Sequence, residues 1–350
     1  MAVKYTYDSV LYLRRPPMEG VAMKSIFTLA ALTVTLSFGA YFSTAAADYP
    51  TKPIRIIVPY SAGGSLDQIS RAFASVADKQ LGQSIVIVNK PGANGMIGEL
   101  DGITANPDGY TLTTRNTSIS TALEWEKLNG RKAPYLQEDF IHLGAFTLDP
   151  VLVTVPYSSP WNTMDDMVKT AKAKPNTYRF GSGSMGTSLP GFILMKALGI
   201  KMRHVPYNGG GPLLAALAGG HVDFSGQWPS TSIPLAQGKK IKILAVQGER
   251  RLKAIPDMPT TAQLGIKGSE WEQWIGLAVP KKTPQDVVDK LKGVTEKVAK
   301  DSAFIKIIET AGGEVVFMDG PALTKRIPHE AARISRILKE LLESGEIKKD

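Results

Sequence analysis

Runs of branched and apolar residues alternate with helically spaced ones along most of the chain. Ile54 to Val58 is a β-branched run typical of a buried strand, and Leu66 to Leu81 repeats apolar residues every three or four positions, which predicts a helix. The same alternation continues toward the C-terminus. Further strands are predicted over 84–89, 110–114, 151–155, 178–180, 203–205, 221–225, 241–246 and 275–279. Further helices are predicted over 96–105, 164–173, 189–198, 213–218, 285–299 and 322–342.

Strands that alternate with helices in this way indicate βαβ units and sheets that are mainly parallel. The strands are too many for one small sheet, so we expect an α/β fold of two domains. The chain is expected to cross between the domains near Leu148–Val151 and near Trp271–Ile275, with the C-terminal helices returning to the first domain. Pro328 predicts a kink or a break in the last helix. The segment Glu124–Glu138 is polar and irregular, which predicts a surface insertion.

The N-terminus has the three parts of a secretory signal peptide. Lys24 follows Met23, a mostly apolar run covers 26–38, and Ala45–Ala47 ends the segment. The disfavoured alternative is a permanent membrane anchor, because the apolar run is shorter than the ~20 residues that a spanning helix needs. We therefore expect residues 1–47 to be an upstream extension plus a signal peptide, with translation starting at Met23, cleavage after Ala47 and export of the mature chain.

Composition excludes several kinds of chemistry. The 350 residues contain no cysteine, which rules out disulfides, thiolate nucleophiles and Cys-type zinc sites. The four histidines form no H-x-x-x-H or H-E-x-x-H pair, so neither a metal nor a cofactor is expected. Lys and Arg number 41 against 32 Asp and Glu, a net charge of +9. The basic residues are scattered and no nucleic-acid motif occurs, so the charge favours small anions over nucleic acid as partners.

The first candidate for binding chemistry is the loop Pro59–Asp67, which lies between a predicted strand and a predicted helix. Ligands in open α/β sheets bind in loops of this kind, beyond the C-terminal ends of strands. Gly63 and Gly64 allow the backbone to approach a ligand, and the start of the helix presents free N–H groups to an anion. Ser65 is placed to N-cap that helix. The alternative is a plain turn between a strand and a helix.

The second candidate is Gly181–Gly186, which fits the pattern G-x-G-x-x-G between a strand and a helix. A dinucleotide site would need an acidic residue about 20 positions later, and Lys201–Pro206 offers none. We therefore interpret the loop as a second anion cradle. Its hydroxyl donors would be Ser182, Ser184, Thr187 and Ser188. No P-loop and no G-x-S-x-G motif occurs, which disfavours nucleotide hydrolysis and esterase chemistry, although an Asp-His-Ser triad formed only in space stays open.

Several segments match, in order, the motifs of one known family. They are Tyr49–Asp67, Asn89–Gly98, Asn106–Leu112, Val205–Pro212, Pro256–Thr260 and Trp274–Leu277. In these segments, and over nearly all of residues 48–350, the chain resembles the Bug family of extracytoplasmic solute receptors. These are the TctC-like substrate-binding proteins of tripartite tricarboxylate transporters.

The resemblance implies a type II periplasmic binding-protein fold, in which two lobes joined by a hinge close on a small carboxylate. Lobe 1 would contain residues 48–150 and 275–350, and lobe 2 residues 151–274. The implied protein is a monomeric periplasmic receptor, not an enzyme, that delivers a small organic carboxylate to the membrane permease subunits of its transporter. The alternative is a periplasmic sensor that presents its closed form to a signalling partner, and a hydrolase is a third, disfavoured hypothesis.

The expected ligand-binding residues come from both glycine-containing loops and from the end of a later strand. They are Tyr60, Ser61, Gly63, Gly64, Asp67, Ser182, Gly183, Ser184, Gly186, Thr187, Gln227 and Trp228. The chain departs from the family's pattern at Ser188–Pro190 and at Ser225–Trp228, both in expected ligand loops. Gln227 and Trp228 suit an acid with a planar or apolar body better than compact citrate. The alternative for Trp228 is packing between the lobes near the hinge.

Overall fold

The structure, a computed structural model, describes residues 49–349, so the expected signal peptide and its cleavage after Ala47 lie outside the described residues. The described strands are β1 (Ile54–Val58), β2 (Ile85–Asn89), β3 (Thr111–Asn116), β4 (Phe140–Pro156), β5 (Arg179–Ser182), β6 (Arg203–Pro206), β7 (Phe224–Gln227), β8 (Ile241–Gln247), β9 (Glu272–Pro280) and β10 (Val315–Asp319). The longer helices are α2 (Ser65–Leu81), α3 (Met96–Ile103), α4 (Thr117–Leu128), α5 (Met164–Ala173), α6 (Met185–Leu198), α7 (Gly210–Ala218), α8 (Pro229–Gln237), α9 (Gln285–Lys300), α10 (Ser302–Thr310) and α11 (Gly320–Glu343). Two short 3₁₀ helices are η1 (Ala93–Gly95) and η2 (Gln137–Asp139).

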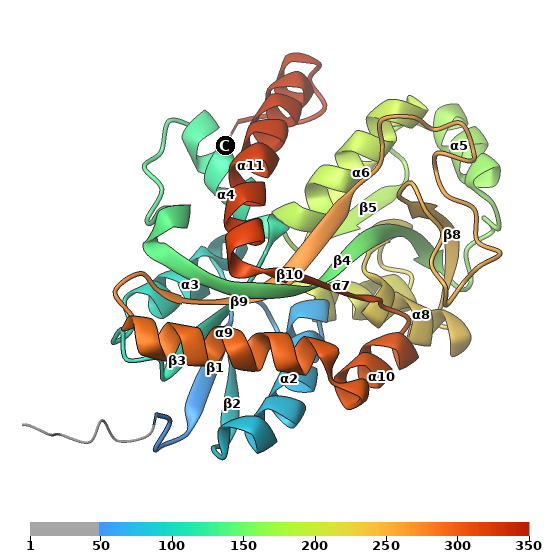
Figure 1. The fold of residues 1–350 in the computed structure, drawn as a ribbon. Coiled ribbons are helices and arrows are strands. Elements are labelled where there is room, and N and C mark those ends of the chain that lie inside the picture. The colour runs from blue at the N-terminus through green and yellow to red at the C-terminus, as the bar shows by residue number, and fades with distance from the viewer. Residues whose placement is uncertain (1–48, 350) are drawn as a thin grey trace, which may run out of the picture. The chain divides into compact units, whose positions relative to one another are not determined.

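The strands form one continuous sheet in the order β2-β1-β3-β9-β4-β7-β5-β6, with β8 and β10 also paired to β4 (Figure 1). Strand β4 joins the two parts of the sheet because its partners change along its length. From Phe140 to Pro150 it pairs with β9, and from Val151 to Pro156 it pairs with β8. The change falls at one of the two crossings expected from the sequence. The boundaries of the two lobes stay a prediction.

Helices cover both faces of the first part of the sheet. Phe146 of β4 packs against Phe73 of α2 and Phe304 of α10, with ring centroids 5.1 and 5.5 Å away. Its neighbour Ala145 packs instead with residues of α11. Because successive side chains of a strand point to opposite faces, α2 and α10 lie on one face and α11 on the other. Figure 1 shows the same arrangement, with α9 and α11 on opposite sides of β4.

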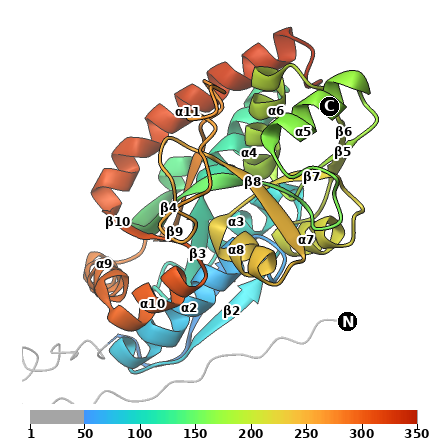
Figure 2. The same ribbon diagram turned by 90° about the vertical axis from the view of Figure 1, so that its right-hand side faces the viewer.

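The second part of the sheet is also covered on both faces. Val153 of β4 belongs to a buried cluster with residues of α5 and α6. The preceding residue, Leu152, packs with Ile233 of α8, and α7 contributes Leu213 to a neighbouring cluster. In Figure 2, α5 and α6 lie above β8 and α7 and α8 lie below it. Strands β1 and β5 therefore end between helical layers, each running directly into a loop that starts a helix. These two loops are the two that the sequence singled out.

The expectation of mainly parallel sheets was wrong. β1 runs parallel to β2 and β3, and β5 runs parallel to β6 and β7. Every pairing of β4 and β9 is antiparallel. These two long strands connect the two parts of the sheet in opposite directions, and neither is built from a βαβ unit. The sheet is therefore mixed.

Three local expectations also differ from the structure. The helix α11 continues from Gly320 to Glu343 through Pro328, so the expected break is absent, while a kink at Pro328 stays a prediction. The supposed insertion Glu124–Glu138 begins as the last part of α4, and Trp125 in it is buried. Gly64, not Ser65, is the N-cap of α2. Among residues 49–349, no helix has the length and apolar character needed to cross a membrane.

Candidate functional site

A small cavity, here called the central cleft, lies where the loops after β1 and β5 meet the starts of several helices. It is lined by Tyr60, Ser61, Gly64, Ser65, Leu66, Asp67, Asn116, Gly183, Ser184, Thr187, Gly210, Gln227, Trp228 and Thr231. Its volume is about 30 Å³. A cavity of that size has room for about two water molecules, or for the oxygens of one carboxylate.

Nine of the twelve residues expected from the sequence line the central cleft, and Gly63, Ser182 and Gly186 do not. The N–H of Gly63 donates to Asp67 within its own loop, and Ser182 lines a neighbouring cavity. Gly186 packs against α4, where an added Cβ would lie 1.7 Å from Ser118 Oγ. These three residues shape the surroundings of the cleft. Ligand binding by the other nine stays a prediction.

Five helices begin at the central cleft. Gly64, Asn116, Ser184 and Trp228 are the N-caps of α2, α4, α6 and α8, and Gly210 is the first residue of α7. Each helix start carries N–H groups without intrahelical partners and a partial positive charge. Five such starts around one cavity favour an anion inside it.

The sequence revealed only part of this convergence. The two glycine-containing loops were recognised, but Asn116, Gly210 and Thr231 were missed. Asn116 and Gly210 each carry a local signal, since Asn is a preferred N-cap and glycine runs mark close backbone approach. Nothing in the sequence says that these helix starts share a cavity with the other two.

Asp67 is the charged residue among those that line the central cleft, and it is fully engaged. Its carboxylate accepts hydrogen bonds from Arg71 Nε at 3.1 Å, from Asn89 Nδ2 at 3.0 Å and from the N–H of Gly63 at 3.0 Å. Burial acts to raise the pKa of Asp67, but these hydrogen bonds outweigh it and lower the pKa below its usual value. The ionised Asp67 therefore braces the first loop.

Thr187 braces the second loop in a similar way. Its Oγ1 accepts from the N–H groups of Gly183 at 2.9 Å and of Ser184 at 3.2 Å, and it lies 3.1 Å from the carbonyl oxygen of Ser184. Two of the loop's amides and this hydroxyl are thus already paired. In the first turn of α6 the N–H of Thr187 donates to the carbonyl oxygen of Ser184 at 3.1 Å, so the donors left for an anion are the N–H groups of Met185 and Gly186.

The far wall of the central cleft is made of amide and indole groups. Gln227 Nε2 donates to Ser225 Oγ at 2.9 Å, and Asn116 Nδ2 donates to Gln273 Oε1 at 2.9 Å. Trp228 lines the cleft and also belongs to a buried cluster in which α6 and α11 take part. Both uses proposed for Trp228, contact with ligand and packing, are therefore compatible with its position.

The loops of the two parts of the sheet touch directly across the cleft. Ser61 Oγ donates to the carbonyl oxygen of Asn208 at 2.5 Å. A Cβ added to Gly210 would lie 3.2 Å from the Cα of Gly64, and one added to Gly211 would lie 2.3 Å from the carbonyl oxygen of Ala62. At Gly211, therefore, only glycine fits while the two loops lie this close together.

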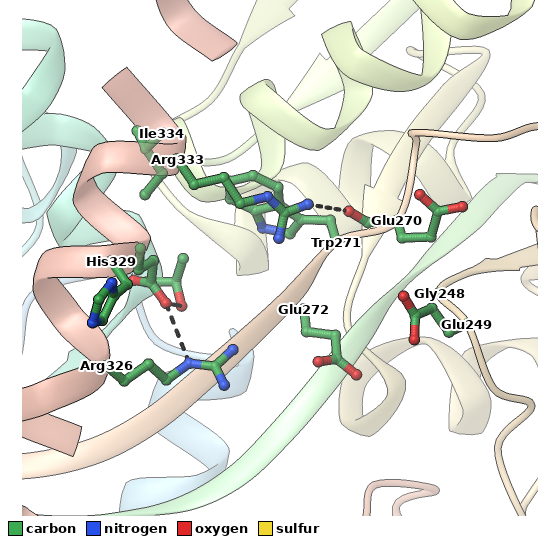
Figure 3. Close-up of a pocket in the computed structure, with 11 residues that line it drawn as sticks. Gly248, Glu249, Glu270, Trp271, Glu272, Arg326, His329, Arg333 and Ile334 are labelled. Carbon is green, nitrogen blue, oxygen red and sulfur yellow. Dashed lines mark hydrogen bonds and ion pairs between the residues drawn. The ribbon is translucent and has the colours of Figure 1, made fainter. Parts of the chain in front are cut away.

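A separate polar cavity of about 490 Å³ lies beside the crossing at Trp271, between that segment and α11 (Figure 3). In Figure 3, Arg333 of α11 reaches across to Glu270, where its Nη2 donates to the backbone oxygen at 2.8 Å. Glu330 of α11 accepts from Trp274 Nε1 at 3.1 Å and from Thr117 Oγ1 at 3.3 Å. Burial raises the pKa of Glu330 to about 7. These contacts tie α11 to the start of α4 and to β9.

The central cleft is arranged to hold an anion. It offers helix starts and neutral side chains, and its acid, Asp67, is held in place by its own loop. In residues 49–349 no group of His, Asp and Glu side chains is arranged to hold a metal ion.

Comparison with known proteins identifies the family to which this chain belongs. The family described as the tripartite tricarboxylate transporter family receptor matches residues 69–342. An Agrobacterium vitis UPF0065 protein, encoded in the TAR-I ttuE-ttuC′ intergenic region, is 30% identical over 323 residues, covering 91% of this chain and 92% of the relative.

Two solved structures share the fold. The periplasmic binding protein BugD is 29% identical, with a TM-score of 0.78, over 86% of this chain and 100% of BugD. Rpa4515 of R. palustris, solved with adipate, is 25% identical, with a TM-score of 0.78, over 83% of this chain and 98% of Rpa4515. The chain therefore belongs to the TctC family of tripartite tricarboxylate transporter receptors, known as the Bug family. It has the α/β fold of periplasmic binding proteins, and its family consists of solute-binding receptors, not of enzymes.

Proposed function

We propose that this protein is a periplasmic receptor that captures a small organic carboxylate in the central cleft and delivers it to the permease subunits of a tripartite tricarboxylate-type transporter. The observation that carries the proposal is the meeting of five helix starts around one cavity. The lining residues include no Lys, Arg or His, so an anion bound there is held by backbone N–H groups and hydroxyls. The adipate bound to Rpa4515 shows that a relative with this fold takes a carboxylate.

Within this proposal, both loops and the far wall have separate roles. Gly64 and Ser184 lie at helix starts that would face the carboxylate, and Ser61 lies in the loop before the first of them. Gln227 and Trp228 would contact the part of the ligand next to it. Tyr60 closes one side, and its hydroxyl donates to the carbonyl oxygen of Asn94 at 3.0 Å.

Isothermal titration calorimetry against mono-, di- and tricarboxylates tests the proposal. We expect at least one acid to bind, and we expect Asn116→Asp to weaken it at least tenfold, because two like charges about 4 Å apart repel by about 4 kcal/mol near a protein surface. Exposed Asn176→Asp makes the same chemical change elsewhere and should leave affinity unchanged. Folded protein that binds no acid in the panel would contradict the proposal.

A further inference from the structure

A second cavity adjoins the central cleft and is far larger. This side chamber encloses about 560 Å³ and is bounded by Asn94, Ser182, Ser184, Phe192, His204 and the C-terminal segment 345–348. Pockets that bind small molecules typically enclose ~300–1,000 Å³. The side chamber therefore has the size of a ligand pocket. The central cleft, at about 30 Å³, has room for little more than one carboxylate group.

The two cavities share a wall. Ser184, the N-cap of α6, lines both of them. On the other side, Tyr60 lines the central cleft, and its hydroxyl donates to the carbonyl oxygen of Asn94, which lines the side chamber. A carboxylate held at the start of α6 is thus directly beside the side chamber, which has room for the rest of the molecule.

The walls of the side chamber are largely apolar. Met185, Leu189 and Phe192 contribute from α6, and Met202 contributes from the segment before β6. Among the described residues that line the chamber, the charged ones are Glu346 and Lys348, both on the C-terminal segment. No charged side chain of the two glycine-containing loops or of α6 faces this space.

Three polar side chains of the side chamber are paired with one another. His204 Nε2 lies 2.7 Å from Ser182 Oγ, which lies 2.7 Å from Ser188 Oγ. The His204 ring stacks on Phe180, with ring centroids 5.4 Å apart, and meets Phe192 edge-on. Burial lowers the pKa of His204 below 6.5, so the imidazole is neutral at pH 7. Away from the C-terminal segment, where Glu346 and the exposed Lys348 line the chamber together, the chamber offers no cation to a second carboxylate.

We propose that the side chamber is a second compartment of the ligand site and that it takes the uncharged, mainly apolar body of a monocarboxylic acid. The inference rests on the proposed function, since it places the carboxylate in the central cleft. It narrows the ligand to alkyl- or aryl-substituted monocarboxylates. A second carboxylate among Met185, Phe192 and Met202 would lose its hydration without a net positive charge to compensate it, since Glu346 offsets Lys348 at the C-terminal segment.

Hexanoate and adipate form the decisive pair of probes, because they have the same six-carbon chain and differ by one carboxylate. We expect hexanoate to bind at least about tenfold more tightly than adipate in calorimetry at pH 7. Adipate binding as tightly as hexanoate would overturn the inference and leave the carboxylate receptor standing. Failure of every acid to bind would instead overturn the proposed function, and the inference with it.

A variant that fills the side chamber tests whether the chamber holds the apolar part of the ligand. Met185→Trp should weaken the affinity for hexanoate at least about tenfold. The affinity for propanoate should change by less than about twofold, because its chain is too short to extend far into the side chamber. Met185→Leu keeps the side-chain volume and should change the affinity for neither acid. Equal losses of hexanoate and propanoate in folded Met185→Trp would contradict the chamber.

The unmodified protein gives an independent readout that does not depend on folding of a variant. With methyl-labelled methionine, NMR should show the Met185 and Met202 signals shifting when hexanoate is added. Propanoate should leave the Met202 signal in place. Unmoved Met185 and Met202 signals at saturating hexanoate would overturn the inference.

Discussion

The side chains that shape the central cleft are held mainly by hydrogen bonds inside the protein. Asp67 accepts from the N–H of Gly63, and Thr187 accepts from the N–H of Gly183. Each bond ties the end of a glycine-containing loop to the first turn of the helix that follows it. The loops are therefore set before a ligand arrives, which reduces the conformational entropy lost on binding.

Trp228 is the residue whose role in ligand choice is most open to measurement. Trp228→Ala is expected to weaken binding of an aromatic acid by about 1–3 kcal/mol, the scale for burying a large apolar side chain, and to weaken a short aliphatic dicarboxylate much less. Because Trp228 is also buried in a cluster with Leu189 and Ile193, the same change should lower the free energy of unfolding by about 3–5 kcal/mol.

Trp228→Phe separates the two roles. It keeps an aromatic ring in the cluster and removes the indole N–H and part of the face. Calorimetry with both ligand classes, together with urea unfolding, provides the comparison. Equal losses for aromatic and aliphatic acids, or a loss of stability alone, would show that Trp228 acts only in packing.

At the scale of elements, α11 carries a buried acid that links stability to pH. Burial raises the pKa of Glu330 from 4.5 to about 7, against the opposing effect of Arg326, whose Nε lies 3.7 Å away. Between these two pH values the folded protein holds a proton that the unfolded chain releases. Stability is therefore expected to fall as pH rises through this window.

Glu330→Gln should flatten this dependence, because the amide has no proton to lose and can still accept from Trp274. Urea unfolding at pH 5 and pH 7.5 measures the difference for each protein. Glu343→Gln, an exposed position at the end of α11, is the matched control and should behave like the unmodified protein. A Glu330→Gln protein with the full pH difference would contradict the assignment.

Sequence patterns predicted some elements closely and missed others. The amphipathic helices α2 and α9 were predicted nearly to the residue. Helix α4 was missed, because it is rich in Ser and Thr and all of its first nine residues are buried, so no polar face marks its period. The first half of β4 was missed for the same reason, since a central strand buried on both faces shows no alternation.

The central cleft shows the same division. Its two glycine-containing loops could be predicted, because each is a local strand–loop–helix pattern. Asn116 and Gly210 could not be assigned to it, because only the folded sheet brings the starts of α4 and α7 to the same place. The side chamber could not be predicted at all, since it is space left between α6, β6 and the C-terminal segment.

At the scale of the whole described chain, the narrow central cleft indicates a closed arrangement. Ser61 contacts Asn208, and the glycines of the first loop lie against Gly210 and Gly211 at the start of α7. A ligand cannot enter a cavity of about 30 Å³ enclosed in this way, so the two parts of the sheet must separate to admit one. We expect the movement to occur where β4 and β9 connect them, as hinge closure in binding proteins requires.

Gly211→Ala tests this closure directly. The added methyl would lie 2.3 Å from the carbonyl oxygen of Ala62, so it should block the closed contact. Locally the change favours helix α7, because alanine is a better helix former than glycine by up to ~1 kcal/mol. The variant should therefore be at least as resistant to unfolding as the parent, yet bind its carboxylate at least about tenfold more weakly.

Small-angle X-ray scattering measures the closure itself, as a change in the radius of gyration. Saturating ligand should reduce the radius of gyration of the unmodified protein and leave that of Gly211→Ala larger. Gly293→Ala makes the same substitution in helix α9, where nothing lies within 4 Å of the added methyl, and should close normally. If Gly211→Ala binds and contracts like the Gly293→Ala control, the close contact of Gly211 with Ala62 does not govern closure.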